Sequence, residues 1–347
     1  MRKLTVIILV AAGLLLLTNG ATAQDDLGKQ LSKLLGDNAK GYLSPVLQDF
    51  GAGLNGGFYH SADLHDILGF DLGLKVGASI VQDADKIFLL TMPADLTVPL
   101  QMSGFPTKYV QLKAGRDYAA TLSTPTVYGA NNGIKVFPTN IPSTTTDGTP
   151  IPQTVRDAFL KQQIYETPPG FDVKYMPTLI PQAALGLPLG FEVIGRFIPK
   201  TNVSDMGKVS FIGYGIRHDI DRYFPMMPID IAIHFMTQKF SLYDNADAKV
   251  LSGNMTAYGI EVSKSLAILT IYGGYQMEKS KWEIESYNYI ETTTNTKVPI
   301  PGFSVEGDRT SRFHAGIRLL LLIINVHADY SFGNQPVITA GVGITLR

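Results

Sequence analysis

The sequence predicts an all-β protein: an antiparallel transmembrane β-barrel of 12 to 14 strands with a short N-terminal helical plug. Three observations predict this fold. Apolar and polar residues alternate near the C-terminus, and the N-terminus has the form of an export signal. In addition, no segment after that signal stays apolar for the roughly 20 residues that a spanning helix needs.

The alternation is clearest in residues 309–347. Phe313, Ile317 and Leu319 share one face of a strand, and His314 and Arg318 share the other, because successive side chains point to opposite faces. The segments 324–332 and 338–346 repeat the pattern. Small and charged residues gather on the non-apolar face, which is typical of a barrel with lipid outside and a watery or plugged lumen.

Residues 1–23 have the form of a secretory signal peptide. A basic start precedes the apolar run Leu4–Leu17, and Ala21-Thr22-Ala23 has the small-x-small pattern that predicts cleavage after Ala23. Without a spanning helix, the mature chain can cross a membrane only as a closed barrel, because lipid offers no partner to backbone polar groups. The expected location is the bacterial outer membrane, with outer-membrane lipid as a partner.

Composition excludes several functions. The 347 residues include no cysteine, which excludes a disulfide scaffold, a thiolate metal site and a cysteine nucleophile. Removing residues 1–23 takes away Arg2 and Lys3, so 27 of the 29 basic residues remain against 30 acidic ones. This balance leaves no excess of basic residues, which a nucleic-acid-binding surface would need.

Twelve strands can be placed by working back from the C-terminus, an even number as outer-membrane barrels require. The expected ranges are 336–346, 322–333, 309–320, 266–287, 250–263, 228–242, 208–220, 189–199, 178–187, 118–130, 87–97 and 67–80. Long connections at 131–175, 243–249 and 288–308 then share one side, and short ones at 188 and 264–265 the other. Further crossings within 99–115 and 282–290 would make fourteen.

Residues 24–66 have a helical rather than a strand period. The spacing fits two sets of apolar residues, Leu27, Leu31, Leu34 and Leu35, then Tyr42, Val46, Leu47 and Phe50, and glycines at 51, 53, 56 and 57 are expected to end the second helix. This segment is expected to fold back into the lumen as a plug, or to cover the barrel mouth as a periplasmic helix. The barrel itself is expected over residues 67–347.

Several segments carry a family resemblance: Tyr42–Pro45, Gly51–Tyr59, His65, Gly69–Gly73, Ile180–Leu187, Gly195–Pro199, Gly213–Asp219 and His327–Gly333. In these segments the chain resembles an uncharacterised family of bacterial outer-membrane barrels, known as a domain of unknown function. More distantly, a helical segment ahead of a barrel is similar to the long-chain fatty-acid transporter family, which implies a plug that gates hydrophobic compounds. That family's asparagine-proline-alanine plug signature is not present here, so the ligand class cannot be carried across.

The end of the chain departs from the usual pattern. Outer-membrane barrels commonly end on an aromatic residue that the barrel assembly machinery reads during insertion, whereas this chain ends Thr345-Leu346-Arg347. The final strand keeps its alternation, so the assembly machinery stays an expected partner. The departure leaves a soluble exported barrel or sandwich as an alternative.

The main candidate site consists of charged residues at strand positions whose side chains are expected to point into the barrel. They are Lys75, Glu192, Arg196, Arg217, Asp219, Arg318, His327 and Asp329. An unpaired charge facing lipid would cost about 2–4 kcal/mol near the bilayer midplane, so these side chains are expected to pair or to contact water. They would form inter-strand ion pairs, or else a polar lining or latch that holds the plug.

Other patterns carry less weight. Gly51-x-Gly53-x-x-Gly56 matches the dinucleotide fingerprint but follows a helix, so no cofactor is expected. His60, Asp63, His65 and Asp66 offer metal-ligand atoms, but a polar turn entering the first strand is the preferred interpretation and no metal is expected. In the long loop, a short helix at 153–164 would place Val155, Phe159 and Ile164 in an external apolar patch that captures a ligand or caps the loop.

The leading hypothesis is passive passage or binding of a small, hydrophobic molecule through a plugged lumen, without catalysis. One alternative is a structural or interaction barrel whose long loops bind a partner protein or surface glycan. Another is a barrel lipid hydrolase, which needs a serine and a histidine side by side on the lipid-facing wall, His314 being the first histidine to test.

Overall fold

The computed structural model describes residues 36–346 except 103–104, 204–206, 225, 292–295 and 308–309. The predicted signal peptide and the predicted helix with Leu27, Leu31, Leu34 and Leu35 lie outside these residues. The described chain divides into two compact units. We call residues 46–82 and 173–346 the barrel unit, and residues 36–45 with Asp83–Asp172 the insert unit.

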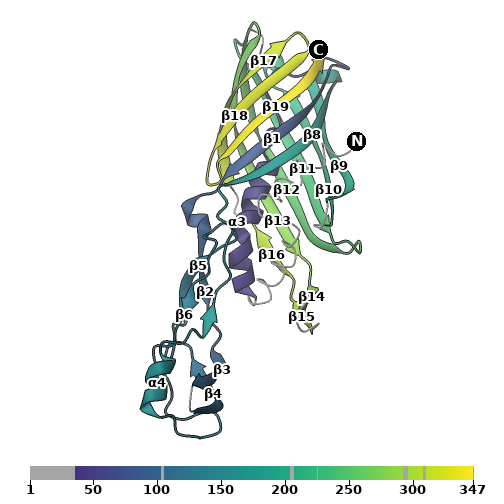
Figure 1. Cartoon of the computed structure of the whole chain (residues 1–347). Coiled ribbons are helices and arrows are strands. Elements are labelled where there is room, and N and C mark those ends of the chain that lie inside the picture. The colour runs from purple at the N-terminus through teal and green to yellow at the C-terminus, as the bar shows by residue number, and fades with distance from the viewer. Residues whose placement is uncertain are drawn as a thin grey trace. The chain divides into compact units, whose positions relative to one another are not determined.

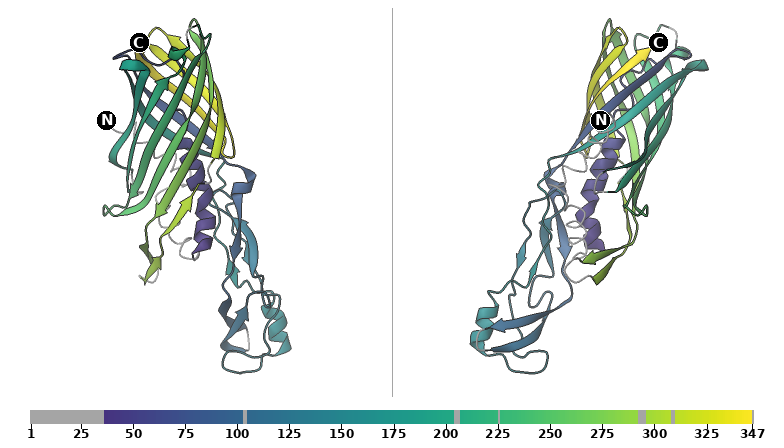
Figure 2. Two further views of the ribbon diagram at one scale, coloured as in Figure 1. Left: turned by 180° about the vertical axis from the view of Figure 1, so that it is seen from behind. Right: turned by 45° about the vertical axis from the view of Figure 1, so that its right-hand side comes forward.

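Within the described residues, ten antiparallel strands close the barrel (Figure 1). They are β1 (Phe70–Ile80), β8 (Tyr175–Leu187), β9 (Phe191–Asn202), β10 (Lys208–Asp219), β11 (Asp230–Tyr243), β12 (Lys249–Leu266), β13 (Leu269–Ile284), β17 (Thr310–Leu321), β18 (Ile324–Phe332) and β19 (Val337–Leu346). Pairing of β1 with β19, from Phe70 opposite Leu346 to Ser79 opposite Val337, completes the ring. A short strand, β16 (Phe303–Glu306), pairs with β13 outside it. Figure 2 shows the tilt of the strands.

Ten strands correct the expected 12 to 14. The segments expected to cross at 87–97 and 118–130 instead form β2 (Ile87–Thr91) and β5 (Thr121–Pro125), which pair with each other in the insert unit. The segment 99–115 lies in a hairpin of β3 (Asp95–Met102) and β4 (Phe105–Lys113). Residues 282–290 supply the end of β13 and part of β14 (Tyr287–Glu291), which pairs with β15 (Thr296–Ile300). A hairpin outside the barrel can show the same alternation as a barrel strand.

The predicted alternation is confirmed in the C-terminal strands. In β18, Asn325, His327 and Ser331 are buried, whereas Val326 and Phe332 are exposed. The same division holds in β17 and β19. Polar side chains therefore fill the inside of the barrel and apolar ones point out, which is the reverse of a soluble barrel.

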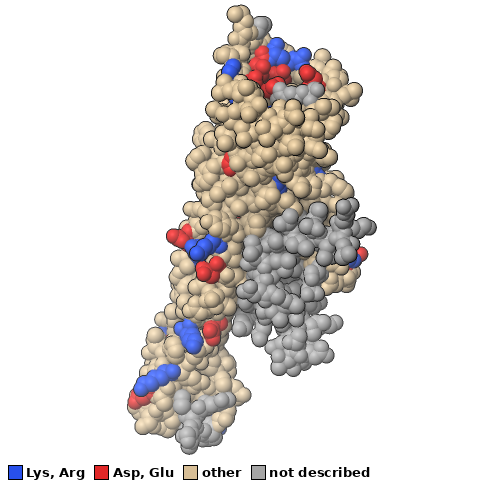
Figure 3. Space-filling model, turned by 45° about the horizontal axis from the view of Figure 1, so that its top comes forward, with Lys and Arg blue, Asp and Glu red and all other residues tan. Residues whose placement is uncertain are grey.

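The outer wall is apolar over most of its height. Exposed large apolar side chains occur on all ten strands, among them Leu72, Leu74, Val76, Tyr175, Leu185, Val193, Phe197, Ile212, Tyr214, Ile216, Ile233, Phe235, Tyr258, Ile260, Val262, Ile271, Met277, Phe313, Ile317, Leu319, Val326, Phe332, Ile338, Val342 and Ile344. In Figure 3 this wall is largely uncharged, and charged groups gather at the upper end of the barrel in that view. A continuous exposed apolar surface of this kind marks contact with lipid or another apolar partner.

The two ends of the barrel differ in their connections. Where β1 begins and β19 ends, the connections are residues 188–190, 220–229, 267–268 and 322–323. The connections at the opposite end are residues 81–174, 203–207, 244–248, 285–309 and 333–336. We call these the short-turn end and the long-loop end. The predicted gathering of the long connections at one end is confirmed.

Helix α3 (Asp37–Leu54) contributes to both units. Its first part belongs to the insert unit, where the Tyr42 ring packs edge-on against Phe88 and the Tyr42 hydroxyl donates to the Pro169 carbonyl at 2.7 Å. Its last turns belong to the barrel unit. The helix runs through Gly51 and Gly53 and ends at Leu54, so the glycines stop it a turn later than expected. No described helix is long and apolar enough to span a membrane.

The insert unit has a core of its own. Its buried side chains include Leu90, Leu100, Val110, Leu112, Tyr118, Tyr128 and Phe159. The expected helix at 153–164 is present as α4 (Gln153–Phe159), and the short strands β6 (Lys135–Val136) and β7 (Tyr165–Glu166) pair beside it. The predicted range 67–347 thus holds a barrel interrupted by an independent insert.

The structure corrects the expected external ligand patch. Phe159 is fully buried in the core of the insert unit, and Val155 and Ile164 are half-buried. The backbone N–H of Ile164 donates to the Val136 carbonyl, which fixes this part of the chain. The three side chains therefore stabilise the insert unit and form no exposed landing surface.

Acid should unfold the insert unit through Asp117, whose buried carboxylate accepts hydrogen bonds from Arg116, the Lys113 backbone N–H and the Asn140 amide. Burial acts to raise the pKa of Asp117, but these donors outweigh it and hold the pKa below 3.8. A lowered pKa in the folded state gives stability that is present above the unfolded value and is lost as the pH falls through the folded one. Protease resistance of the insert unit should therefore drop below about pH 4, less steeply in Asp117→Asn. An identical acid profile in that variant would contradict the assignment.

Candidate functional site in the barrel interior

Residues 46–66, which we call the inner segment, lie inside the ring of strands. The Ser79 hydroxyl of β1 donates to the Asp49 carbonyl at 2.7 Å, and Phe50 packs against Phe240 of β11 and Trp282 of β13. Further along the segment, the side-chain amide of Gln182 in β8 donates to the backbone carbonyl of Phe58 at 2.9 Å. Strands on different sides of the ring thus contact one continuous stretch of chain.

Inward side chains bind the C-terminal end of α3. Arg196 of β9 donates to the Leu54 and Gly56 carbonyls at 2.8 and 2.9 Å. Arg312 of β17 donates to the Ala52 carbonyl at 2.9 Å. The last carbonyls of a helix have no intrahelical partner and carry partial negative charge, so cationic donors there are favourable.

Two glutamines complete this set of donors. Gln238 of β11 donates to the Leu54 carbonyl at 3.1 Å and to the Asn55 side-chain oxygen at 2.9 Å. Gln276 of β13 donates to the Asn55 backbone carbonyl at 3.0 Å. We call Arg196, Gln238, Gln276 and Arg312 the helix-end clamp.

Glycines let the helix lie close to the wall. A Cβ at Gly53 would lie 2.8 Å from the Thr178 side chain and 3.2 Å from the Ser79 hydroxyl. After the helix, Gly57 has φ +65° and would place a Cβ 2.6 Å from Thr339. Gly53, which belongs to the spacing that mimics a dinucleotide fingerprint, therefore serves close packing, and Gly57 after it serves a left-handed turn.

Aromatic and histidine rings surround Tyr59 just beyond the helix. The ring centroid of Tyr59 lies 5.7 Å from that of His234, 5.9 Å from Tyr272 and 6.0 Å from His314. Tyr59 is buried, and the Arg217 guanidinium lies 5.8 Å from its ring. The inner segment is thus packed as well as hydrogen-bonded.

Arg217 of β10 centres a buried ionic network. It contacts Glu261 and donates to Glu192 at 2.6 Å, and it also donates to the Ser61 carbonyl of the inner segment. The second oxygen of Glu192 lies 2.6 Å from His65 Nδ1. Inter-strand ion pairing and attachment of the inner segment are therefore combined in one cluster.

A second polar cluster joins β1 and β18 to His60. His60 Nε2 lies 3.3 Å from Asp71, whose carboxylate also accepts a hydrogen bond from Asn325 at 2.6 Å. Lys75 Nζ lies 2.9 Å from His327 Nε2, and the rings of His60 and His327 contact each other with centroids 4.6 Å apart and planes tilted by 37°. These contacts connect His60 of the inner segment with the wall at β1 and β18.

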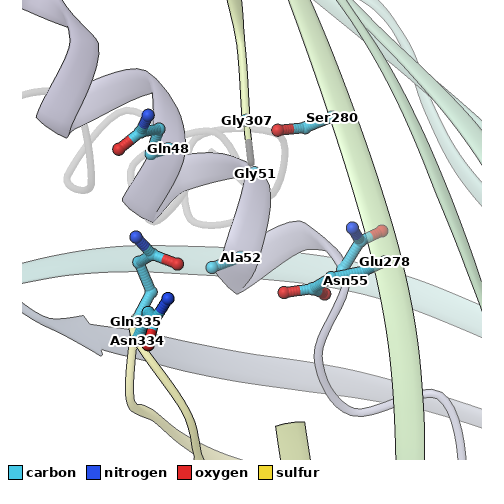
Figure 4. A pocket seen from close by; sticks show the side chains of 9 residues that line it. All are labelled: Gln48, Gly51, Ala52, Asn55, Glu278, Ser280, Gly307, Asn334 and Gln335. Atoms are coloured by element: carbon cyan, nitrogen blue, oxygen red, sulfur yellow. The ribbon is translucent and has the colours of Figure 1, made fainter. Parts of the chain in front are cut away.

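Two small cavities lie beside the inner segment. A polar cavity of about 40 Å³ lies beside the last turn of α3, lined by Gln48, Gly51, Ala52, Asn55, Glu278, Ser280, Gly307, Asn334 and Gln335 (Figure 4). A second cavity of about 10 Å³ is lined by Gly57, Phe58, Tyr59, Tyr272, Gln276, His314 and Asp329. A water needs roughly 10–15 Å³ measured in this way, so these cavities suit a few waters rather than an organic solute.

The eight predicted residues do not all meet. Seven of them are buried on strands: Lys75, Glu192, Arg196, Arg217, Arg318, His327 and Asp329. Asp329 accepts a hydrogen bond from the Tyr272 hydroxyl at 3.1 Å. Asp219, the last residue of β10, is half-buried and accepts the backbone N–H of Arg222 instead of contacting the inner segment.

Sequence reasoning missed Gln182, Gln238, Gln276, Glu261 and Arg312, which make many of the contacts. The sequence did carry one signal for them: each occupies an inward position in the alternating pattern of its strand. His60 and His65, assigned to a polar turn, lie in the interior, and no three metal-ligating side chains converge in the part of the chain that is described.

The structure also locates the histidine named for a lipid hydrolase. His314 Nδ1 lies 2.8 Å from the Ser331 hydroxyl, and both side chains are buried inside the barrel. A serine and a histidine do lie side by side, but on the inner face. This pair has no contact with the lipid-facing wall that the hydrolase hypothesis requires.

Removing the charge of Arg217 should destabilise the barrel. Arg217→Met leaves Glu192 and Glu261 buried without their cation, which typically costs about 3–5 kcal/mol. The temperature at which the protein loses its folded gel mobility should fall, and a second substitution, Glu261→Gln, should recover part of the loss. Lys208→Met on the same strand removes a half-buried partner of the exposed Asp247 and is the matched control. Equal effects of Arg217→Met and Lys208→Met would contradict this prediction.

Solved structures with low similarity to this one are outer-membrane barrels. The outer-membrane protein OmpT of Vibrio cholerae, in its trimer form, matches at 11% identity and a TM-score of 0.26, over 80% of this chain and 98% of that chain. The translocator domain of the autotransporter NalP of Neisseria meningitidis matches at 10% identity and 0.26, over 87% and 93%. The attachment invasion locus protein Ail of Yersinia pestis matches at 8% identity and 0.21, over 81% and 99%. These likenesses transfer no ligand and no activity.

Sequence comparison gives the family. No curated protein matches the chain in sequence. A family model described as "Family of unknown function (DUF6588)" matches residues 1–346, nearly the whole chain, in agreement with the resemblance drawn from its motifs. The resemblance to fatty-acid transporters stays a prediction. The chain belongs to DUF6588, a family of unknown function.

Proposed function

We propose that this protein is an outer-membrane channel that is closed at rest by its own inner segment, and that small solutes pass only when this plug is displaced. The helix-end clamp carries the proposal. Its four side chains come from four separate strands and bind carbonyls in the last turn of α3 and just after it. A segment held in this way blocks the lumen until those hydrogen bonds are exchanged for others.

The surface of the barrel supports a place in the outer membrane. The closed ring leaves no unpaired edge among its ten strands, and large apolar side chains point outward on each of them. These are the two conditions that a lipid bilayer imposes on a β-structure. In this orientation the short-turn end faces the periplasm and the long-loop end faces outward.

The lining favours polar solutes over the hydrophobic cargo first expected. Buried charged and amide side chains surround the inner segment, and each buried polar group left unpaired costs about 1–3 kcal/mol. An apolar solute that displaced the plug would leave these groups unpaired, whereas a polar solute or water would satisfy them. The proposal is therefore passage of small polar or charged molecules, without catalysis.

A second candidate function rests on the insert unit. A sequence of some ninety residues, Asp83–Asp172, with its own buried core, is more than a barrel needs to join β1 to β8. Such an insert suits a barrel that presents a binding domain for a partner protein or glycan. This candidate predicts that conductance stays absent whatever happens to the plug.

Conductance in planar bilayers tests the main proposal. The mature chain should be silent, and a chain lacking residues 25–57 should conduct, because α3 and the clamped carbonyls are gone. A truncation of residues 25–36 leaves α3 whole and is the matched control, expected to stay silent. Silence of the longer truncation, in protein shown to be folded by its gel mobility, would refute the channel and favour the interaction barrel.

A further inference from the structure

We infer that the inner segment is threaded through the barrel from the long-loop end, so that the chain before Val46 emerges on the outer face of the membrane. This inference rests on the proposed function only in placing the barrel in the outer membrane. A plug could equally enter from the periplasmic side, and the contacts along residues 49–68 decide between the two directions.

The beginning of the inner segment lies at the long-loop end. Asp49 contacts Ser79, the residue before the end of β1. Phe50 packs against Phe240 and Trp282, which lie close to the points where β11 and β13 pass into the connections 244–248 and 285–309. All three contacts are within the barrel unit.

The end of the inner segment lies at the short-turn end. Ala62 donates its backbone N–H to Ser263 at 3.0 Å, near the end of β12, and His65 contacts Glu192, the second residue of β9. The Leu68 N–H then donates to the Gly186 carbonyl, next to the end of β8. The segment therefore crosses the lumen once, along its length, before β1 begins at Phe70.

Covalent continuity determines on which side of the membrane the preceding residues lie. Since the chain enters the lumen at the long-loop end, residues preceding Val46 leave the barrel there. In outer-membrane barrels the chain ends and short turns face the periplasm and the longer loops face outward. The first half of α3 is then external, although β1 starts from the periplasmic side.

This threading assigns the direction of control. At the short-turn end the plug continues within a few residues into β1. A periplasmic protein therefore could not pull the plug out by a free chain end there. At the long-loop end the same helix, α3, continues into the insert unit, where Asn38 exchanges hydrogen bonds with the Thr91 backbone at 2.7 and 2.9 Å. A macromolecule that binds the insert unit from outside can therefore act on the plug through α3.

Cysteine labelling tests the threading, and the absence of native cysteine makes single replacements clean. Asp37→Cys and Lys40→Cys probe exposed positions in the first turns of α3, Asn245→Cys marks the long-loop end, and Ser265→Cys marks the short-turn end. Intact cells are treated with a membrane-impermeant maleimide, before and after permeabilisation of the outer membrane. We expect labelling at 37, 40 and 245 in intact cells, and at 265 only after permeabilisation.

The labelling results test the threading of the inner segment and the placement of the barrel in the membrane separately. Protection of 37 and 40 in intact cells, with 245 labelled and 265 protected, would overturn the threading and leave the plugged channel in place. Equal labelling of 245 and 265 before permeabilisation would instead overturn the placement of the barrel in the membrane. Two probe positions in α3 guard against a local effect at either one, and folding of each variant is checked by its gel mobility.

Discussion

Replacing Arg196 by alanine should turn the closed barrel into a conducting one. Its guanidinium donates hydrogen bonds to the Leu54 and Gly56 carbonyls. It also donates to the side-chain oxygens of Gln182 and Gln238, and it lies 4.3 Å from the centre of the Phe58 ring. Hydrogen bonds to charged groups contribute about 1.5–3 kcal/mol each, so losing the two bonds to the helix end should weaken the hold by about 3 kcal/mol. That is a roughly 100-fold rise in the displaced population, at 1.4 kcal/mol per factor of ten.

The open probability of single channels in planar bilayers measures this effect. Lys200→Ala, on the same strand, removes an exposed side chain that pairs with Asp247 and is the matched control. It should leave the barrel silent. If Arg196→Ala and Lys200→Ala are equally silent, the helix-end clamp does not hold the barrel closed.

Gly53→Val should also open the barrel, because it prevents the helix from packing against the wall. Even a single Cβ at this position would lie 2.8 Å from Thr178, and valine adds two further methyl groups. The wall at this point is β-sheet, and overpacking such a site typically costs about 1–3 kcal/mol or more. We expect conductance approaching that of the chain lacking residues 25–57, with folded gel mobility retained.

The matched control for Gly53→Val is the same substitution in β9. A Cβ at Gly195 meets nothing within 4 Å, so Gly195→Val should fold normally and remain silent. Conductance in both variants would mean that valine disturbs the strands rather than the plug. Silence of both would show that the helix does not pack against Thr178.

The inward or outward direction of the side chains on the C-terminal strands could be predicted from the sequence, whereas the number of barrel strands could not. Period-two alternation separates inward from outward positions, which is why residues such as Arg196 and Arg217 were assigned to the interior. The pair of strands β2 and β5 carries the same alternation but belongs to the insert unit. Because these are two strands, counting them as barrel strands still gives an even total. The rule that outer-membrane barrels have an even number of strands therefore does not reveal the error.

The helix-end clamp was only partly predictable, for a different reason. Charged residues on a strand must be paired or hydrated, which makes Arg196 conspicuous in the sequence. Neutral amides such as Gln238 and Gln276 give no such signal, since they are common on solvent-facing strands too. Which carbonyl each side chain binds depends on how far α3 enters the ring, and that depth is set by the close packing at Gly51 and Gly53.

A disulfide between the plug and the wall tests the central claim most directly. An ideal Cβ at Gly51 lies 3.2 Å from Cβ of Ser280, so Gly51→Cys with Ser280→Cys needs a shift of only a few tenths of an ångström to reach the usual separation of about 3.5–4.5 Å. The double variant should cross-link on mild oxidation in native membranes, detected by mass spectrometry of the linked peptides. Gly51→Cys with Ser265→Cys, at the opposite end of the barrel, should not. Cross-linking of the first pair alone would place α3 inside the ring, and its absence under conditions where both thiols are free would contradict a barrel closed by its own N-terminal segment.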